Sequence, residues 1–176
     1  MKAKAVLLCI ACFRFLVCEV TAQSVLFNFD TAPLYTPLPL YQTSGGITAH
    51  FTATGQGYSI QAANTMGFTP VGFAGNCIYP SSIYASDLLI SFDILLTDIS
   101  IMYAPQELAT DSSCTMKMSA YLGSTFVASN TYSNPNPGTW PTGILALTSS
   151  AQAFDNVVVH YQAPPVTGGD LSLIHI

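Results

Sequence analysis

Carboxylates and histidines are the side chains that could carry acid-base chemistry in this chain, and none of them forms a recognisable catalytic pattern. Eight carboxylates follow residue 22, and glycoside hydrolysis needs two of them facing each other across a cleft. Their spacing singles out no pair, although Asp93 and Glu107 are the two that a secreted hydrolase would use. His50 and His160 each lie opposite the apolar set of an expected strand, which is typical of surface histidines. A nucleophile turn of the Gly-x-Ser-x-Gly type and phosphate-binding glycines are both missing from the sequence. We therefore expect no enzyme activity.

Cys77 and Cys114 are the only cysteines after residue 22. Two cysteines in an exported chain indicate one disulfide, and neither has a histidine near it in sequence that would favour a metal pair. Closing a loop of nearly forty residues would stabilise the fold by roughly 3 to 4 kcal/mol in the chain-entropy model. The sequence predicts a structural Cys77–Cys114 disulfide.

Trp140 is the single tryptophan, and it lies in a loop rich in proline with Tyr132 and Asn134 close by. An indole held in a rigid loop could stack on the face of a sugar ring while Asn134 hydrogen-bonds to its hydroxyls. The indole could equally fill the open end of a β-sandwich, and we favour this structural role. Trp140, Tyr132 and Asn134 are the candidate ligand-binding residues.

Strict alternation of apolar and polar residues shows which elements must position these side chains. It predicts half-buried strands, with Leu88, Ile90, Phe92 and Ile94 facing inward in one of them. Further strands follow from the same pattern and from runs rich in Val, Ile, Thr, Phe and Tyr. They cover 25–30, 47–54, 57–62, 98–103, 115–122, 124–132, 142–148 and 156–162. In the strand over 115–122, Met116, Met118, Ala120 and Leu122 face inward. No segment has a sustained helical period, so about nine short strands predict an all-β, antiparallel two-sheet sandwich of the jelly-roll type.

The composition excludes several classes of protein. Charged residues make up only 7% of the chain, against about 25% in average soluble domains, and the formal net charge is −5. Lys117 is the only Lys or Arg after Arg14, so a phosphate-binding surface is not expected and nucleic acid is excluded as a partner.

Both ends of the chain are expected to lie outside the fold. Residues 1–22 have a basic start, an apolar stretch and a small-residue cleavage site, which is typical of a secretory signal peptide and too short to span a bilayer. Residues 171–176 match one reading frame of the transposon mosaic end used in sequencing-library preparation. We therefore expect a scar at 171–176, a β-sandwich domain over 23–170, and a natural chain that continues further. A genuine short final strand over 171–176 is the alternative.

The strand sequences resemble those of a known family. The runs Val25 to Asp30, Ile90 to Asp93, Ala120 to Ser124 and Phe154 to Val157 look like those of secreted bacterial β-sandwich domains of the galactose-binding-like type. Such domains are common in extracellular proteins with a Pro-Glu-Pro sorting tail. The resemblance implies a structural Ca²⁺ near Asp30, although an aspartate that caps a turn is the stronger interpretation of this residue.

The sequence thus leads to a non-catalytic, secreted or cell-surface module that binds glycan or extracellular matrix. Two alternatives stay open. One is a secreted polysaccharide hydrolase. The other is a self-assembling structural or adhesion subunit, because edge strands with few lysines pair readily with those of another copy. The oligomeric state is left open.

Overall fold

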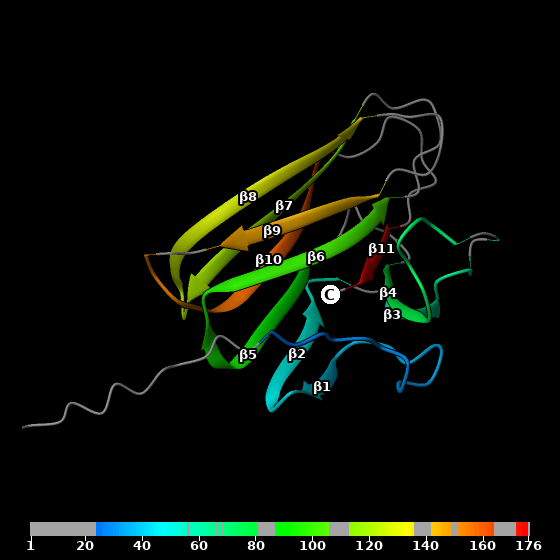
Figure 1. Ribbon diagram of the computed structural model, residues 1–176, viewed down its shortest axis with the longest axis horizontal. Helices are drawn as coiled ribbons and strands as arrows, with labels where there is room; N and C mark the ends of the chain where they lie inside the picture. The colour runs from blue at the N-terminus through cyan, green and yellow to red at the C-terminus, as the bar shows by residue number, and fades with distance from the viewer. Residues whose placement is uncertain are drawn as a thin grey trace, which may run out of the picture.

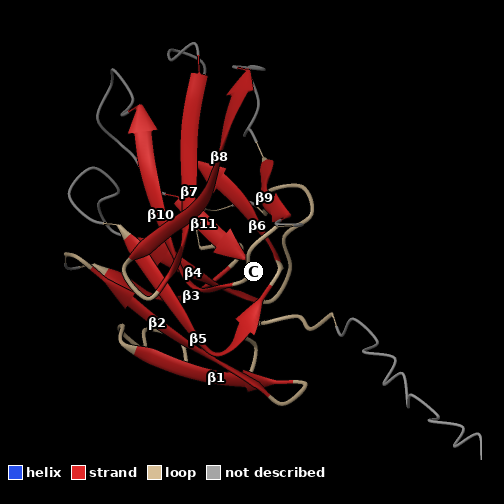
Figure 2. Cartoon of the chain, turned by 90° about the vertical axis from the view of Figure 1, so that its left-hand side faces the viewer, coloured by secondary structure: helices blue, strands red, loops and turns tan. Residues whose placement is uncertain are grey.

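The structure is a computed structural model that describes residues 24–55, 57–65, 67, 69–80, 87–105, 113–135, 142–148, 151–163 and 172–175. These residues form eleven strands and no helix (Figure 2). No helix in this part of the chain could therefore cross a membrane. The expected signal peptide, residues 1–22, lies outside the described residues.

The strands form two antiparallel sheets (Figure 1). The six-stranded sheet has the order β1 (Leu40–Ser44), β2 (Ile47–Ala53), β5 (Leu88–Leu96), β10 (Phe154–Ala163), β7 (Ser113–Leu122) and β8 (Thr125–Pro135). The five-stranded sheet has the order β3 (Tyr58–Ala62), β4 (Asn76–Pro80), β11 (Ser172–His175), β6 (Asp98–Pro105) and β9 (Gly143–Thr148). The predicted two-sheet β-sandwich is confirmed.

One apolar core lies between the two sheets, and the alternation in the sequence builds it. Successive side chains of a strand point to opposite faces, so every second residue reaches the core. The six-stranded sheet contributes Phe51, Leu88, Ile90, Met118 and Val157, and the five-stranded sheet contributes Ile60, Ile78, Ile101, Tyr103 and Leu145. Each fully buried side chain of this size contributes about 1.5 to 3 kcal/mol relative to an exposed one.

Two residues that the alternation places inward are exposed. Ile94 lies in an irregular part of β5, where a single residue of β10, Asp155, lies opposite residues 92–95 and the regular register is lost. Leu122 is the last residue of β7 before the two-residue turn to β8, so it extends beyond the core. The predicted hairpin at this turn is confirmed, and Gly123 takes the positive φ of 58° that glycine accepts without strain.

The first predicted strand, 25–30, does not form, although the segment is extended. Phe27 and Phe29 are buried in the core, but the segment has no strand pairing. Side chains of β1 satisfy its carbonyls instead: the amide of Gln42 donates to Asn28, and the hydroxyl of Ser44 donates to Leu26 at 2.8 Å. The segment therefore covers the core without joining a ladder.

Three strands were not predicted: β1, β4 and β11. β11 lies between β4 and β6 in the five-stranded sheet and pairs with both in antiparallel register. This placement differs from the expectation that 171–176 lie outside the fold, because a short apolar strand satisfies the backbone groups that β4 and β6 would leave open. That residues 171–176 are encoded by a sequencing-library adapter is a statement about the DNA, and it stays a prediction.

Candidate functional site

One row of side chains crosses the outer face of the entire six-stranded sheet. Each member is the register partner of the next, and the row consists of Tyr41, His50, Ser91, Asn156, Tyr121 and Phe126. The residues beside them in each central strand, such as Ala49, Ile90 and Ala120, face the core, so this row points away from it. We call these six side chains the outer row. At a strand spacing of about 4.8 Å it is roughly 24 Å long.

Aromatic pairs occupy the two ends of the outer row. The Tyr41 ring lies 4.5 Å from the His50 ring at an interplanar angle of 72°, and 63% of Tyr41 is exposed. At the other end the Tyr121 and Phe126 rings lie 5.9 Å apart at 77°, and 55% of Phe126 is exposed. Edge-to-face contact fixes one ring of each pair against its neighbour and leaves apolar surface for a ligand. Each end can therefore act as a stacking platform.

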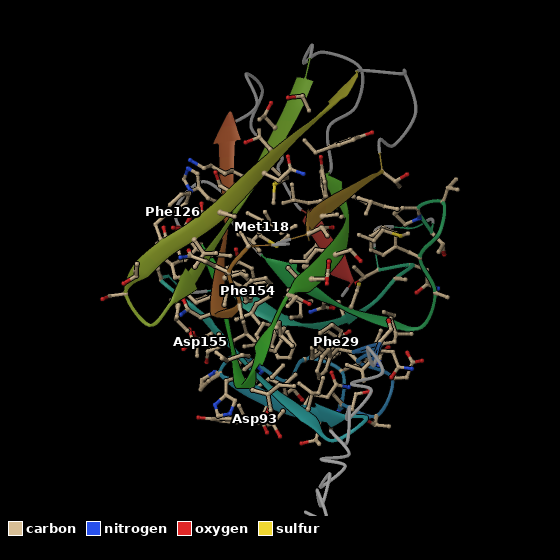
Figure 3. All side chains as sticks on the ribbon, turned by 60° about the vertical axis from the view of Figure 1, so that its left-hand side comes forward. Phe29, Asp93, Met118, Phe126, Phe154 and Asp155 are labelled. Carbon is tan, nitrogen blue, oxygen red and sulfur yellow. The ribbon has the colours of Figure 1, made fainter. Side chains whose placement is uncertain are left out.

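Ser91 and Asn156 occupy the middle of the row, and hydrogen bonds fix the position of the Asn156 side chain. The Asn156 amide donates to the Gly123 carbonyl at 2.9 Å and to the Asp155 carboxylate at 2.6 Å. The Gly123 backbone N–H donates to the same carboxylate at 2.9 Å. Asp155 and Asn156 thus tie β10 to the β7–β8 turn, which leads into the start of β8, where Phe126 lies. In Figure 3, Phe126 and Asp155 lie toward the margin of the molecule, while Met118 and Phe154 lie in its interior.

A shallow depression of about 360 Å³ lies beside the polar middle of the row. Its walls combine hydroxyl, amide and carboxylate groups with aliphatic side chains: Thr52, Leu89, Ser91, Asp155, Asn156 and Val158. A depression with both apolar walls and a few polar groups is typical of small-molecule sites.

The charged groups around the row are largely engaged. Asp93 accepts the Thr48 backbone N–H at 2.9 Å. Asp87 pairs with His160, whose Nδ1 lies 2.6 Å from the Asp87 carboxylate. His50 and His160 were predicted on the strand face opposite the apolar side chains. The strand register confirms this, because His50 pairs with Ser91 and His160 pairs with Lys117. With most charges paired, this face presents mainly hydroxyl, amide and aromatic groups to solvent.

Of the predicted ligand-binding residues, Tyr132 is the one whose side chain the structure describes, and it does not join this surface. Trp140 lies outside the described residues, as does the side chain of Asn134, whose backbone belongs to β8. The Tyr132 ring lies 6.1 Å from the ring of the buried Tyr103 at 78°, and the Tyr103 hydroxyl donates to the Tyr132 carbonyl at 3.1 Å. Tyr132 pairs in register with the core residue Met116, so it faces the other sheet and not the side of Phe126.

Asp30 makes a structural contact. Its Oδ1 accepts the Asn76 backbone N–H at 2.8 Å and lies against Gly75, where a Cβ atom would approach this oxygen to 1.9 Å. Asp30 therefore ties the first extended segment to the start of β4. No cluster of three or more His, Cys, Asp or Glu side chains suited to a metal occurs in the described parts of the chain. Calcium binding at Asp30 stays a prediction.

The hydrolase alternative receives no geometric support from the residues that the structure describes. Glu107 lies outside them, and Asp93 is engaged by the backbone of β2. The Asp93–Glu107 pairing is therefore untested.

Cys77 is a free, buried thiol, so the predicted disulfide is absent from the structure. Ile78, the next residue of β4, faces the inter-sheet core, so Cys77 lies on the opposite face of the strand. It packs there with Ala63 and Phe73, away from the six-stranded sheet that contains Cys114. Burial raises the pKa of the Cys77 thiol to about 12. Burial also raises the pKa of Tyr79, with a smaller contribution from the charge of Cys77.

The outer row could be found only in part from the sequence. Alternation places His50, Ser91 and Tyr121 on the solvent face of their strands, but it does not say which of them lie side by side. That information is in the strand register.

Comparisons with known proteins add no family assignment. No protein-family model matches the chain, and no curated protein matches it. One similar solved structure is the family 32 carbohydrate-binding module of C. perfringens NanJ in complex with galactose, with a TM-score of 0.39, 14% identity and coverage of 72% of this chain and 93% of that chain. Another is the enzymatically active domain of tailspike protein 4 of bacteriophage CBA120, with a TM-score of 0.36, 14% identity and coverage of 74% of this chain and 18% of that chain. At these TM-scores neither similarity bears on the ligand or activity of this chain.

Proposed function

We propose that this protein is a non-catalytic binding module that holds an uncharged glycan on the outer row. The observation that carries the proposal is the continuous row itself, with an aromatic pair at each end and the polar side chains of Ser91 and Asn156 between them. Sugar rings have apolar faces that stack on aromatic rings and hydroxyl groups that hydrogen-bond to hydroxyl and amide side chains. The row offers both kinds of contact in one line.

A neutral ligand fits this face better than a charged one. The carboxylate of Asp93 is already bonded, and that of Asp87 is paired with His160. An anionic glycan would need basic partners, and Lys117 is the only Lys or Arg of the chain after residue 14. A row that crosses six strands favours an extended oligosaccharide over a single sugar.

The proposal includes export of the protein to the cell surface or medium. It rests on the basic and apolar pattern of residues 1–22 and on the sparse charge of the remaining chain. Peptide sequencing of the secreted protein would test it, with Gln23 as the expected first residue.

Affinity electrophoresis of the full chain through neutral and sulfated polysaccharides tests the binding role. We expect at least one neutral polysaccharide to retard the protein, and Phe126→Ala or Tyr41→Ala to weaken that interaction about tenfold or more, which corresponds to about 1.4 kcal/mol. Val71→Ala is the matched control, because Val71 is 82% exposed but lies in the β3–β4 connection, away from the outer row. Equal retardation of all four proteins would overturn the assignment of the site.

A further inference from the structure

The two sheets have four edge strands, β1 and β8 in the six-stranded sheet and β3 and β9 in the five-stranded sheet. An edge strand presents backbone N–H and C=O groups that can pair with a strand of another molecule. Other parts of the chain engage the edges of β3, β8 and β9, whereas the backbone of β1 pairs only with β2 among the described residues. The β1 edge is therefore open to a partner strand.

Residues 35–38 cover the edge of β3. The Tyr35 N–H donates to the Ile60 carbonyl at 2.7 Å, and the Ile60 N–H donates to the Thr36 carbonyl at 2.9 Å. The Leu38 N–H donates to the Tyr58 carbonyl at 3.2 Å. This loop occupies the place that a further strand would take.

The Asn130 side chain links the edges of β8 and β9. Its amide donates to the Ala146 carbonyl of β9 at 2.7 Å, and its Oδ1 accepts the Thr131 N–H of β8 at 2.8 Å. The two edge strands therefore close one side of the sandwich against each other.

The strand register shows which backbone groups of β1 point outward. The Thr48 N–H of β2 donates to Asp93 of β5 at 2.9 Å, so the backbone groups of Thr48 point away from β1. Thr48 and its register partner Thr43 therefore form a non-hydrogen-bonded pair, and the same holds for Tyr41 two residues earlier. The N–H and C=O groups of Tyr41 and Thr43 consequently point away from β2, toward the open edge.

Nothing in the described part of the chain covers this edge. The side chains of Gln42 and Ser44 bind the carbonyls of residues 28 and 26, and they alternate with the outward side chain of Tyr41, so that segment lies on the inner side of β1. Figure 2 shows β1 at the lower margin of the molecule, with the other described strands above it. The sequence Leu40–Ser44 also lacks the charge, proline or bulge that commonly protects an edge strand.

We propose that two copies of the protein pair through β1, in antiparallel register about a two-fold axis at Gln42. Tyr41 of each copy then lies opposite Thr43 of the other, and all the outward N–H and C=O groups of both residues find partners. An axis at Tyr41 would set Thr43 opposite Pro39, which has no N–H, and an axis at Thr43 would set Tyr41 opposite Gly45 in the turn. The register centred on Gln42 is therefore the one that satisfies the edge completely.

This pairing would join the two six-stranded sheets into one continuous sheet and keep both outer rows on the same face. That one polysaccharide could then contact both rows rests on the proposed function, whereas the pairing itself does not. Because only a five-residue strand meets its copy, the contact belongs to the weak, transient class of interfaces.

Sedimentation equilibrium of the full chain without ligand tests the proposal. We expect a monomer–dimer equilibrium with a dissociation constant between about 1 μM and 1 mM. A single monomeric mass at every concentration up to about 1 mM would overturn it.

Matched variants identify the edge that pairs. Thr43→Lys places a charge on the β1 edge and should raise the dissociation constant at least about tenfold, whereas Ser129→Lys, at an exposed site of the β8 edge, should leave it unchanged. Thr43→Pro should also weaken pairing, and it removes an N–H that points away from β2, so no bond of the β1–β2 ladder is lost. Dimerisation of both Thr43 variants as strong as that of the parent would overturn the role of β1.

Cysteine cross-linking tests the register. With the axis at Gln42, the two copies of this residue form a non-hydrogen-bonded pair with Cα atoms about 4.5 Å apart, which suits a disulfide. The two copies of Thr43 would lie about 8 Å apart, which is too far. Mild oxidation should therefore cross-link Gln42→Cys into a dimer and Thr43→Cys no more than the parent, and the reverse result would overturn the proposed register.

Discussion

At the residue scale, several polar side chains that could be mistaken for reactive groups hold backbone segments together. The carboxylates of Asp30, Asp93 and Asp155 each accept a backbone N–H from a distant part of the chain. Hydrogen bonds that involve a charged group contribute about 1.5 to 3 kcal/mol, so these aspartates act as structural ties. The few charges of this chain are largely used to hold extended segments in place.

Cys77 provides a residue-scale prediction about pH. Its pKa is about 12 in the folded protein against an ordinary value of 9.0, so the unfolded chain loses this proton first as the pH rises. The contribution of Cys77 to stability is therefore constant below pH 9 and falls between pH 9 and 12. The free energy of unfolding should drop by about 1.4 kcal/mol from this residue between pH 7 and pH 10.

Urea unfolding of the parent protein and of Cys77→Ala at both pH values measures this loss. The variant should lack the extra drop, although its stability at pH 7 is lower because a buried side chain has been shortened. The same pH dependence in both proteins, or a peptide map that contains a Cys77–Cys114 disulfide, would contradict the buried thiol.

Gly75 and Gly123 give a second prediction at this scale, because both have positive φ angles, 63° and 58°. A Cβ at Gly75 would lie 1.9 Å from the Asp30 carboxylate, whereas a Cβ at Gly123 meets nothing within 4 Å. Alanine at either site costs about 1 to 2 kcal/mol from the backbone, and only Gly75→Ala also displaces the Asp30 carboxylate from the Asn76 N–H, a further loss of about 1.5 to 3 kcal/mol. Equal loss of stability in the two variants, measured by chemical denaturation, would show that Asp30 does not occupy this position.

At the element scale, alternation predicted most of the strands, and the exceptions have physical causes. The buried sets of β5 and β7 follow directly from Leu88, Ile90, Met116 and Met118, which face one side at every second position. Ile94 is exposed although alternation places it inward, because the pairing of β5 with β10 is irregular at this position. Such an irregularity depends on the partner strand, so the sequence of one strand cannot reveal it.

The unpredicted strands and the outer row were missed for the same reason: both depend on pairing between strands. β1 and β4 are five residues each and lie next to prolines, so their own sequences give weak strand signals. Pairing with β2 and β3 stabilises them in the fold. The outer row similarly needs the register of five strand pairs, which no local pattern encodes. The sequence therefore predicts the sandwich and the solvent face of each strand, but not the site formed across strands.

The β7–β8 turn gives an element-scale prediction. Asp155→Ala removes the acceptor of the Gly123 N–H and of the Asn156 amide, so the free energy of unfolding should fall by about 1.5 to 3 kcal/mol. Asp98→Ala is the matched control with the same change in charge, because the Asp98 carboxylate accepts the hydroxyl of its neighbour Thr97, and its effect should stay within about 0.5 kcal/mol. A smaller loss for Asp155→Ala than for Asp98→Ala would refute the role of Asp155.

At the scale of the whole molecule, the sandwich separates three surfaces by chemical character. The outer face of the six-stranded sheet is rich in hydroxyl and aromatic groups, and a recess beside the β5–β6 turn is lined by apolar residues that include Val25, Phe27, Ile99 and Leu147. The outer face of the five-stranded sheet is covered near β4 by Ala63 and Phe73, which enclose Cys77. The outer row is therefore the broad polar surface on which we place glycan binding.

Chemical-shift mapping of the full chain with a neutral oligosaccharide that retards it is the most direct test of this assignment. We expect the largest changes at the backbone amides of Tyr41, Ser91, Asn156, Tyr121 and Phe126, along the outer row, with saturation that follows the measured affinity. Changes confined to the predicted rim residues Trp140, Asn134 and Tyr132, with the outer row unaffected, would contradict the assignment and return the site to the loop first suggested by the sequence.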